Sequence, residues 1–204
     1  MFTEESFKVF DIEGLDNRMA AIRSEIQPIF QELNEYFQEK LSPVAGEEFF
    51  IHIAQHRRRT THAPENTWSA LSRKKRGYKM EPHFQLGIWP DYVFMWLSCI
   101  DQPKNEQAIA QKMLDEPELF TKLSSDFKLS GDHTKAEVKD LSAEAVEKLL
   151  IRFRDVKKGE FQIGRIISKD SPLWKEPEAA KSYMIKTYQQ LMPIYQAIIQ
   201  EAAE

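Results

Sequence analysis

Cysteine is almost absent from this sequence. Its only cysteine among 204 residues is Cys99, so no disulfide can form within the chain. A chain without disulfides is typical of a reducing compartment, and we expect a cytoplasmic protein. Cys99 lies in an apolar run, which predicts a buried, unreactive thiol. Glycine is scarce too, at seven residues, which argues against long flexible linkers and favours one domain over residues 1–204.

Long apolar runs are also missing. The longest extends from Tyr92 to Ile100, roughly half the ~20 residues that a transmembrane helix needs. The N-terminal residues MFTEESFKVF are acidic early and lack a basic segment before an apolar stretch, so we expect no signal peptide. Neither end carries a lipidation motif. These features predict a protein without a membrane partner.

The sequence signatures of several enzyme classes are absent. There is no glycine-rich phosphate loop ending in Lys-Ser or Lys-Thr, no GxGxxG, no HExxH, no GxSxG and no pair of CxxC motifs. An active site assembled from distant residues would leave no such signature. The sequence therefore leaves open whether the protein is an enzyme, which cofactor it uses and how it oligomerises.

Hydrophobic periodicity predicts long helices near both ends of the chain and strands between them. The long helices are expected over 16–41, with a kink or break at Pro28, and over 177–203. Strands are expected over 48–56, 83–89, 92–100, 126–130 and 160–168, and shorter helices over 66–72, 105–114, 118–123 and 142–156.

The order of these elements predicts the fold class. The strands at 83–89 and 92–100 are joined at Pro90-Asp91, which predicts an antiparallel hairpin. The second strand is apolar on both faces and is placed at the centre of the sheet. Because helices and strands do not alternate regularly, we predict an α+β fold with a mixed or mainly antiparallel sheet covered by helices.

Positive charge is concentrated between residues 56 and 83. This stretch holds eight Lys and Arg against two Glu, a net charge of +6, whereas the whole chain carries −4 and the remainder therefore −10. Arginine side chains bind phosphate and carboxylate groups through paired hydrogen bonds, and aromatic rings stack on bases. The candidate ligand-binding residues are Arg58, Arg59, Trp68, Arg76, Gly77, Tyr78, Lys79, His83 and Gln85.

A second group of candidates follows the strand at 126–130. Asp132 could orient the His133 imidazole for acid–base chemistry, but Asp132 and Thr134 are equally typical of a turn that satisfies backbone donors. A site built from His83, Asp132, His133 and one of the earlier histidines, His52 or His56, would also suit a cation such as zinc. We favour the turn and hydrogen-bonded structural histidines, and assign no metal ligand.

Several segments resemble the YktB-like family of low-GC Gram-positive bacteria, a domain of unknown function. The segments are Gly14–Met19, His52, His56, Arg58-Arg59, Pro64, Trp68, Lys75–Lys79, Pro82–Trp89 and Asp132–Lys135. The resemblance extends over almost the whole chain and implies an α+β fold in a cytoplasmic bacterial protein. It implies no activity. His62 and Cys99 lie outside the pattern.

The basic stretch leads to our functional hypothesis, a cytosolic binding module for an anionic, phosphorylated or nucleotide-like ligand. A solvated loop that offsets an acidic body would carry the same charges. Nucleic-acid binding is an alternative, although the acidic remainder of the chain disfavours nonspecific coating of DNA. An enzyme that uses His83, Asp132 and His133, or a regulatory protein that binds another protein, are further alternatives.

Overall fold

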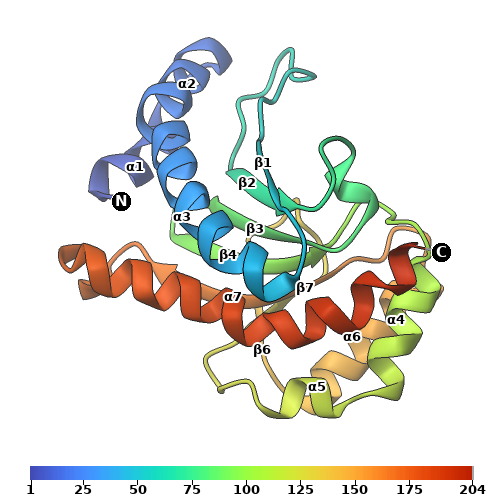
Figure 1. Ribbon diagram of the computed structural model, residues 1–204. Coiled ribbons are helices and arrows are strands. Elements are labelled where there is room, and N and C mark those ends of the chain that lie inside the picture. Colours follow the sequence, from blue (N-terminus) through green and yellow to red (C-terminus); the bar gives the residue numbers. More distant parts are fainter. Residues whose placement is uncertain (204) are drawn as a thin grey trace.

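The fold is built on one sheet of seven strands in the order β1-β2-β3-β4-β7-β5-β6 (Figure 1). The computed structural model describes residues 1–203, and every strand pair in this range is antiparallel. The strands are β1 Phe50–Ile53, β2 Thr67–Ser72, β3 His83–Ile88, β4 Tyr92–Cys99, β5 Lys128–Ser130, β6 Lys139–Asp140 and β7 Phe161–Ser168. Helices pack on this sheet, so the predicted α+β class is confirmed.

Seven α-helices accompany the sheet in the part of the chain that the structure describes. They are α1 Glu4–Lys8, α2 Leu15–Ala21, α3 Gln27–Ala45, α4 Glu106–Asp115, α5 Glu118–Thr121, α6 Ala143–Asp155 and α7 Pro177–Ile199. A short 3₁₀ helix, η3, spans Tyr78–Met80. Within residues 1–203, no helix combines the length and apolar character needed to cross a bilayer.

The long N-terminal helix is divided, as Pro28 predicts. A π-helical turn at Ile22–Ile26 separates α2 from α3, and Pro28 lies in the first turn of α3. Proline cannot donate a backbone N–H to the preceding turn, and the π-helical turn just before it accommodates this interruption of the helical hydrogen bonds. Helix α3 continues past the predicted end at residue 41 and stops at Gly46, whose φ of 73° allows a left-handed cap.

The predicted helix over 66–72 is wrong, because these residues form strand β2. Strand β2 pairs with β1 on one side and with β3 on the other. Ala70 and Leu71 are both buried, so the segment fills an internal position in the sheet. Pairing on both edges satisfies its backbone groups and overrides the weak helix preference of this short stretch.

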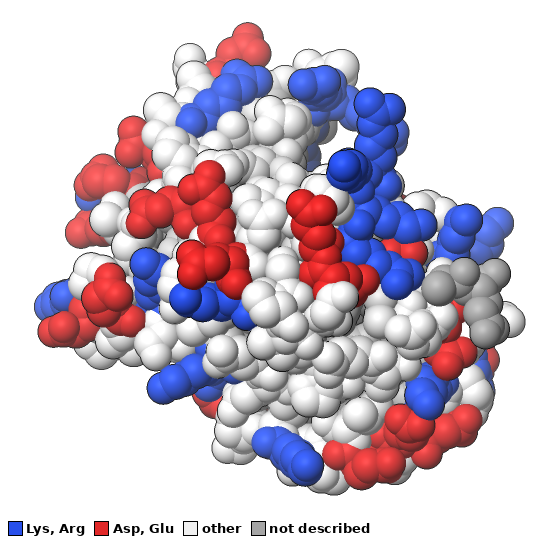
Figure 2. Space-filling view, viewed as in Figure 1, with Lys and Arg blue, Asp and Glu red and all other residues white. Residues whose placement is uncertain are grey.

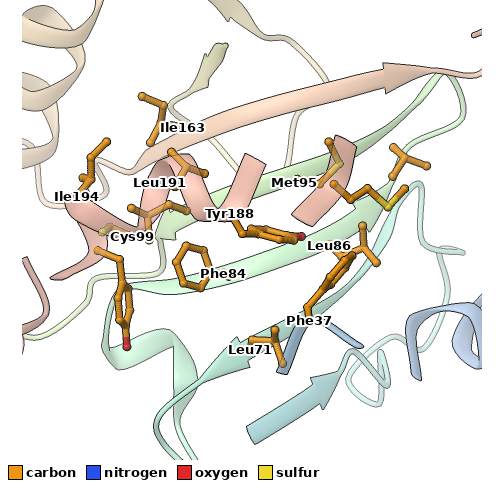
Figure 3. Close-up of a cluster of buried hydrophobic side chains, with 14 of the residues drawn as sticks. Phe37, Leu71, Phe84, Leu86, Met95, Cys99, Ile163, Tyr188, Leu191 and Ile194 are labelled. Carbon is orange, nitrogen blue, oxygen red and sulfur yellow. The ribbon is translucent and has the colours of Figure 1, made fainter. Parts of the chain in front are cut away.

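One face of the sheet forms the main hydrophobic core beneath α3 and α7 (Figure 1). Figure 3 shows Phe37, Phe84 and Tyr188 meeting in this core, and the Tyr188 hydroxyl donates to the Gln85 carbonyl oxygen at 2.7 Å. Cys99 is completely buried in the same core, and burial raises the pKa of its thiol. The predicted buried cysteine is confirmed.

The opposite face of the sheet carries a separate aromatic cluster. Its buried members are Trp89, Tyr92, Phe94 and Trp96, with Trp68, Val138 and Ile166 against them. None of these residues comes from an α-helix. The segment between β5 and β6 crosses this face, where the Tyr92 hydroxyl donates to the Ala136 carbonyl oxygen at 2.6 Å. We call this side of the sheet the open face.

Candidate ligand-binding site

A narrow pocket lies on the open face. The space between its side chains is about the size of one water molecule. It is lined by Asn66, Trp68, Gln85, Trp89, Tyr92, Phe94, Trp96, Ser130, His133, Lys135 and Gln162. Its lining combines apolar rings with a few convergent polar groups.

Strand register brings these residues together. Gln85 is the cross-strand partner of Trp96, and Ser130 is the partner of Gln162. Alternate residues on each strand share a face, so polar side chains of β3, β5 and β7 meet the aromatic rings of β4. Gly87 makes room for the Phe94 ring, because a Cβ there would lie 2.0 Å from Phe94 Cζ. Gln85, a candidate from the sequence, belongs to this lining, whereas the arginines of the basic stretch do not.

His83 is held in one tautomer below the pocket. Its Nδ1 donates to the Glu81 carbonyl oxygen at 2.8 Å, so its Nε2 accepts from the Gln85 amide at 3.0 Å. Burial lowers the pKa of His83 to about 4, which keeps the ring neutral. These bonds fix the side chain of Gln85, and His83 acts as a support for the pocket wall.

Trp68 forms the edge of the pocket and is half-buried. Its Nε1 donates to the Tyr78 hydroxyl at 3.0 Å, and Lys79 Nζ lies 5.6 Å from the centre of its ring. Lys79 also pairs with Asp101 at 3.1 Å. Trp68 is therefore fixed on one side and flanked by a cation.

Two further histidines flank this aromatic pair. The His52 ring centre lies 4.9 Å from that of Tyr78, and the His56 ring centre lies 5.7 Å from that of Trp68. Each ring also has a local partner, since His52 Nε2 bonds the Lys74 carbonyl oxygen and His56 Nε2 bonds Thr67 Oγ1. Both histidines therefore act as hydrogen-bonded structural residues, as the sequence led us to favour.

His133 is oriented by Glu160, a residue that sequence reasoning missed. His133 Nδ1 lies 2.7 Å from Glu160 Oε1, and the His133 backbone N–H donates to Oε2 at 2.7 Å. Asp132 instead accepts from the backbone and side chain of Thr134, at 2.9 and 2.6 Å. The turn that we favoured at 132–134 is therefore present, and the imidazole takes its carboxylate from elsewhere.

Asp132, His133 and Glu160 offer ligand atoms within 4.8 Å of one another. Both Glu160 oxygens already accept N–H bonds, because Asp101 N also donates to Oε1 at 3.1 Å. Asp132 Oδ1 is engaged by Thr134. The arrangement thus suits a carboxylate that positions a histidine better than it suits a bound cation.

The basic stretch divides into cations with partners and cations without. Lys and Arg gather at the upper right of Figure 2, over the β1–β2 loop and the segment after β2. Within it, Arg73 and Lys74 bind the buried Glu81, and Arg59 donates to carbonyl oxygens of its own loop. Among residues 1–203, no ion pair is formed by Arg57, Arg58 or Arg76.

The structure therefore unites some of the candidates from the sequence and separates others. Trp68, Gln85 and His133 line the pocket, and Tyr78, Lys79 and His83 support or flank it. Arg58, Arg59, Arg76, Gly77 and Thr134 are exposed and outside its lining, as is the half-buried Asp132.

Gly77 has a conformational role. Its φ of 72° places it in the left-handed region just before η3, and an added Cβ would make only ordinary contact with Met80. We expect Gly77→Ala to lower the free energy of unfolding by about 1–2 kcal/mol, because alanine disfavours this backbone conformation. Urea unfolding followed by circular dichroism measures this change.

Gly77→Asn serves as the matched control, because asparagine adopts the left-handed conformation more readily than alanine. It should retain more stability than Gly77→Ala. If both variants were as stable as the parent protein, backbone conformation would not be the reason for glycine at this position.

Comparison with known proteins gives a consistent family relationship. Residues 2–195 match the family model described as "Domain of unknown function (DUF1054)". A UPF0637 protein of Enterococcus faecalis is 63% identical over 199 residues, covering 98% of each chain. The UPF0637 protein YsbB of Lactococcus lactis is 52% identical over 203 residues, covering 98% of this chain and 100% of the relative. A UPF0637 protein of Staphylococcus carnosus is 42% identical over 200 residues, covering 95% and 97%.

Proposed function

Because this chain belongs to the DUF1054 family, whose description names no activity, we propose from its geometry that it binds a small anionic ligand on the open face of its sheet. The family resemblance identified from the sequence is thereby confirmed. We propose that the ligand is phosphorylated or nucleotide-like and that binding takes place in the cytoplasm.

The observation that carries this proposal is the environment of Trp68. Its ring is held by Tyr78, lies beside Lys79 and borders a pocket that presents amide, hydroxyl and imidazole groups. A planar ligand group would stack on the exposed part of the Trp68 ring. The lining contains side chains that can donate to phosphate oxygens, among them Gln85 and Lys135.

Arg58 is one of the free cations of the basic stretch that we expect such a ligand to contact. The pKa of Asp101 is lowered, first by its hydrogen bond from Lys79 and further by the charge of Arg58. Arg58 forms no ion pair of its own within the described residues, and its charge acts on the Lys79–Asp101 pair. An anion at this position would gain charge-assisted hydrogen bonds without breaking an existing one.

A ligand panel tests the proposal on the purified full chain. Inorganic phosphate, AMP, ATP and glucose 6-phosphate would be screened by thermal shift, since a ligand at a hundredfold excess over Kd stabilises the folded state by about 2.7 kcal/mol. We expect one or more of these anions to raise Tm. Arg58→Ala should then weaken binding about tenfold or more in calorimetry, because a hydrogen bond to a charged group contributes about 1.5–3 kcal/mol.

Arg154→Ala is the matched control, because Arg154 is distant in sequence and pairs with its neighbour Asp155. It should bind the ligand as the parent protein does. Affinity retained by both Arg58→Ala and Arg76→Ala, or the absence of any shift across the panel, would contradict the proposal.

Single-stranded nucleic acid is a second candidate ligand, favoured by the gathering of Lys and Arg in Figure 2 and by Arg57, Arg58 and Arg76, which form no ion pair within residues 1–203. Such binding would weaken steeply with salt, because each phosphate contact releases a counterion. Titration of a labelled oligonucleotide at several salt concentrations distinguishes it from a small ligand that contacts one or two cations.

A further inference from the structure

Glu160 and His133 form a hydrogen-bonded pair, and His133 belongs to the pocket lining. The Glu160 carboxylate is buried and is already anchored by two backbone N–H groups, those of Asp101 and His133. The imidazole adds a third bond at 2.7 Å from Nδ1 to Oε1. Since a carboxylate only accepts, Nδ1 carries the hydrogen, and Nε2 of the neutral ring keeps its lone pair.

Nε2 is available for chemistry. The His133 side chain is 20% exposed and lines the pocket, and within residues 1–203 no hydrogen bond engages its Nε2. The other pocket histidine differs, because both nitrogens of His83 are bonded and its ring is completely buried. A pocket-lining histidine that a carboxylate orients, and whose second nitrogen has no hydrogen-bond partner among the described residues, suits the role of a general base.

We propose that His133, positioned by Glu160, catalyses the hydrolysis of a phosphate ester held at this site. The inference rests on the proposed binding function and adds a reaction to it. A water molecule gives a proton to His133 Nε2 while its oxygen forms a bond to phosphorus. The bond from phosphorus to the ester oxygen breaks, that oxygen leaves with the bonding electrons on the side opposite the attacking water and takes a proton from solvent, and the imidazolium then releases its proton to solvent. The products are an alcohol and a phosphate.

The surroundings of His133 suit this reaction. Lys135 lines the same pocket, and Lys79 lies over Trp68, whose ring centre is 6.1 Å from that of His133. These cations would stabilise the negative charge that develops on the phosphoryl oxygens. The pocket that His133 helps to line has space of the size of one water molecule, which would hold the proposed nucleophile.

The test uses the full chain with p-nitrophenyl phosphate and bis(p-nitrophenyl) phosphate, following release of p-nitrophenolate. We expect hydrolysis by the parent protein and a fall in kcat of about a hundredfold or more in His133→Ala. Glu160→Gln should lower kcat with KM unchanged, because a side-chain amide no longer fixes the Nδ1–H tautomer. His62→Ala, which changes an exposed histidine, should retain full activity.

Binding of inorganic phosphate, measured by thermal shift on each variant, separates the two proposals. If the parent protein binds phosphate but hydrolyses neither ester, the catalytic inference is overturned and the binding function stands. If neither binding nor hydrolysis occurs, both are overturned. Circular dichroism establishes folding, and His133→Gln replaces His133→Ala if the alanine variant is unfolded. Unchanged kcat in a folded His133 variant would also overturn the inference.

Discussion

Arg73→Ala is expected to lower the free energy of unfolding by about 3 kcal/mol, because it deprives a buried carboxylate of its main partner. Arg73 donates to both oxygens of Glu81, from Nε and from a terminal guanidinium nitrogen, each at 2.9 Å. Glu81 is only 1% exposed. Lys74 Nζ remains 3.1 Å from Glu81, which keeps the expected loss at the lower end of the usual range for broken buried pairs. Urea unfolding at neutral pH measures the change.

The double variant Arg73→Ala with Glu81→Gln is the control that isolates the stranded charge. Removing the carboxylate should restore part of the lost stability, because an uncharged amide is less costly to bury than an unpaired ion. A loss below about 1 kcal/mol in the single variant, or a double variant less stable than the single one, would show that this ion pair contributes little.

This ion pair gives part of the basic stretch a structural role. Burial raises the pKa of Glu81, but its bonds from Arg73 and Lys74 outweigh that effect and lower the pKa below its ordinary value. These two cations therefore neutralise a buried acid. Counting charges along the sequence could not separate them from Arg58 or Arg76, because Glu81 contributes only one of the two negative charges in the stretch. The partners become visible only when β2 and β3 are placed side by side.

The hairpin, the core and His133 as an acid–base candidate followed from the sequence, whereas its partner Glu160 did not. Alternation in β3 and the apolar character of β4 predicted a central hairpin because those signals are local. Glu160 is 27 residues from His133 and lies just before β7. The pairing of Ser130 with Gln162 brings His133 and Glu160 together. The spacing of residues in the sequence does not indicate the register of two strands that are so far apart.

The nearby Asp132 was the natural candidate to orient His133, and the structure shows why proximity in sequence misleads. A short Asp side chain in a turn reaches the backbone N–H two residues ahead more easily than a neighbouring ring. Asp132 does this with Thr134, which leaves the imidazole free to turn toward β7. The preference of Asp for a nearby backbone N–H therefore predicted the turn correctly. Because that preference engages Asp132 within the turn, it could not identify the carboxylate that binds His133.

Acidification from pH 6.5 to 4 is expected to cost roughly 3 kcal/mol of stability through His83 alone. Burial lowers the pKa of His83 to about 4, and the charges of Lys79, His52 and His133 act in the same direction. The unfolded chain, with an ordinary histidine pKa of about 6.5, takes up a proton in this range while the folded state does not. Protonation therefore favours unfolding, and the contribution is fully present only above pH 6.5.

Urea unfolding at several pH values between 4 and 7 measures this dependence. His56, whose pKa burial also lowers to about 4, adds to the slope in the parent protein. His83→Gln should reduce that slope by about one proton, a factor of ten in the unfolding equilibrium constant per pH unit, even if the variant is less stable overall. His62→Ala, at an exposed position, should leave the slope unchanged. If the free energy of unfolding of His83→Gln depended on pH as steeply as that of the parent protein, His83 would take up its proton in the folded state. The ring would then be less firmly enclosed beneath the pocket than its bonds to Glu81 and Gln85 imply.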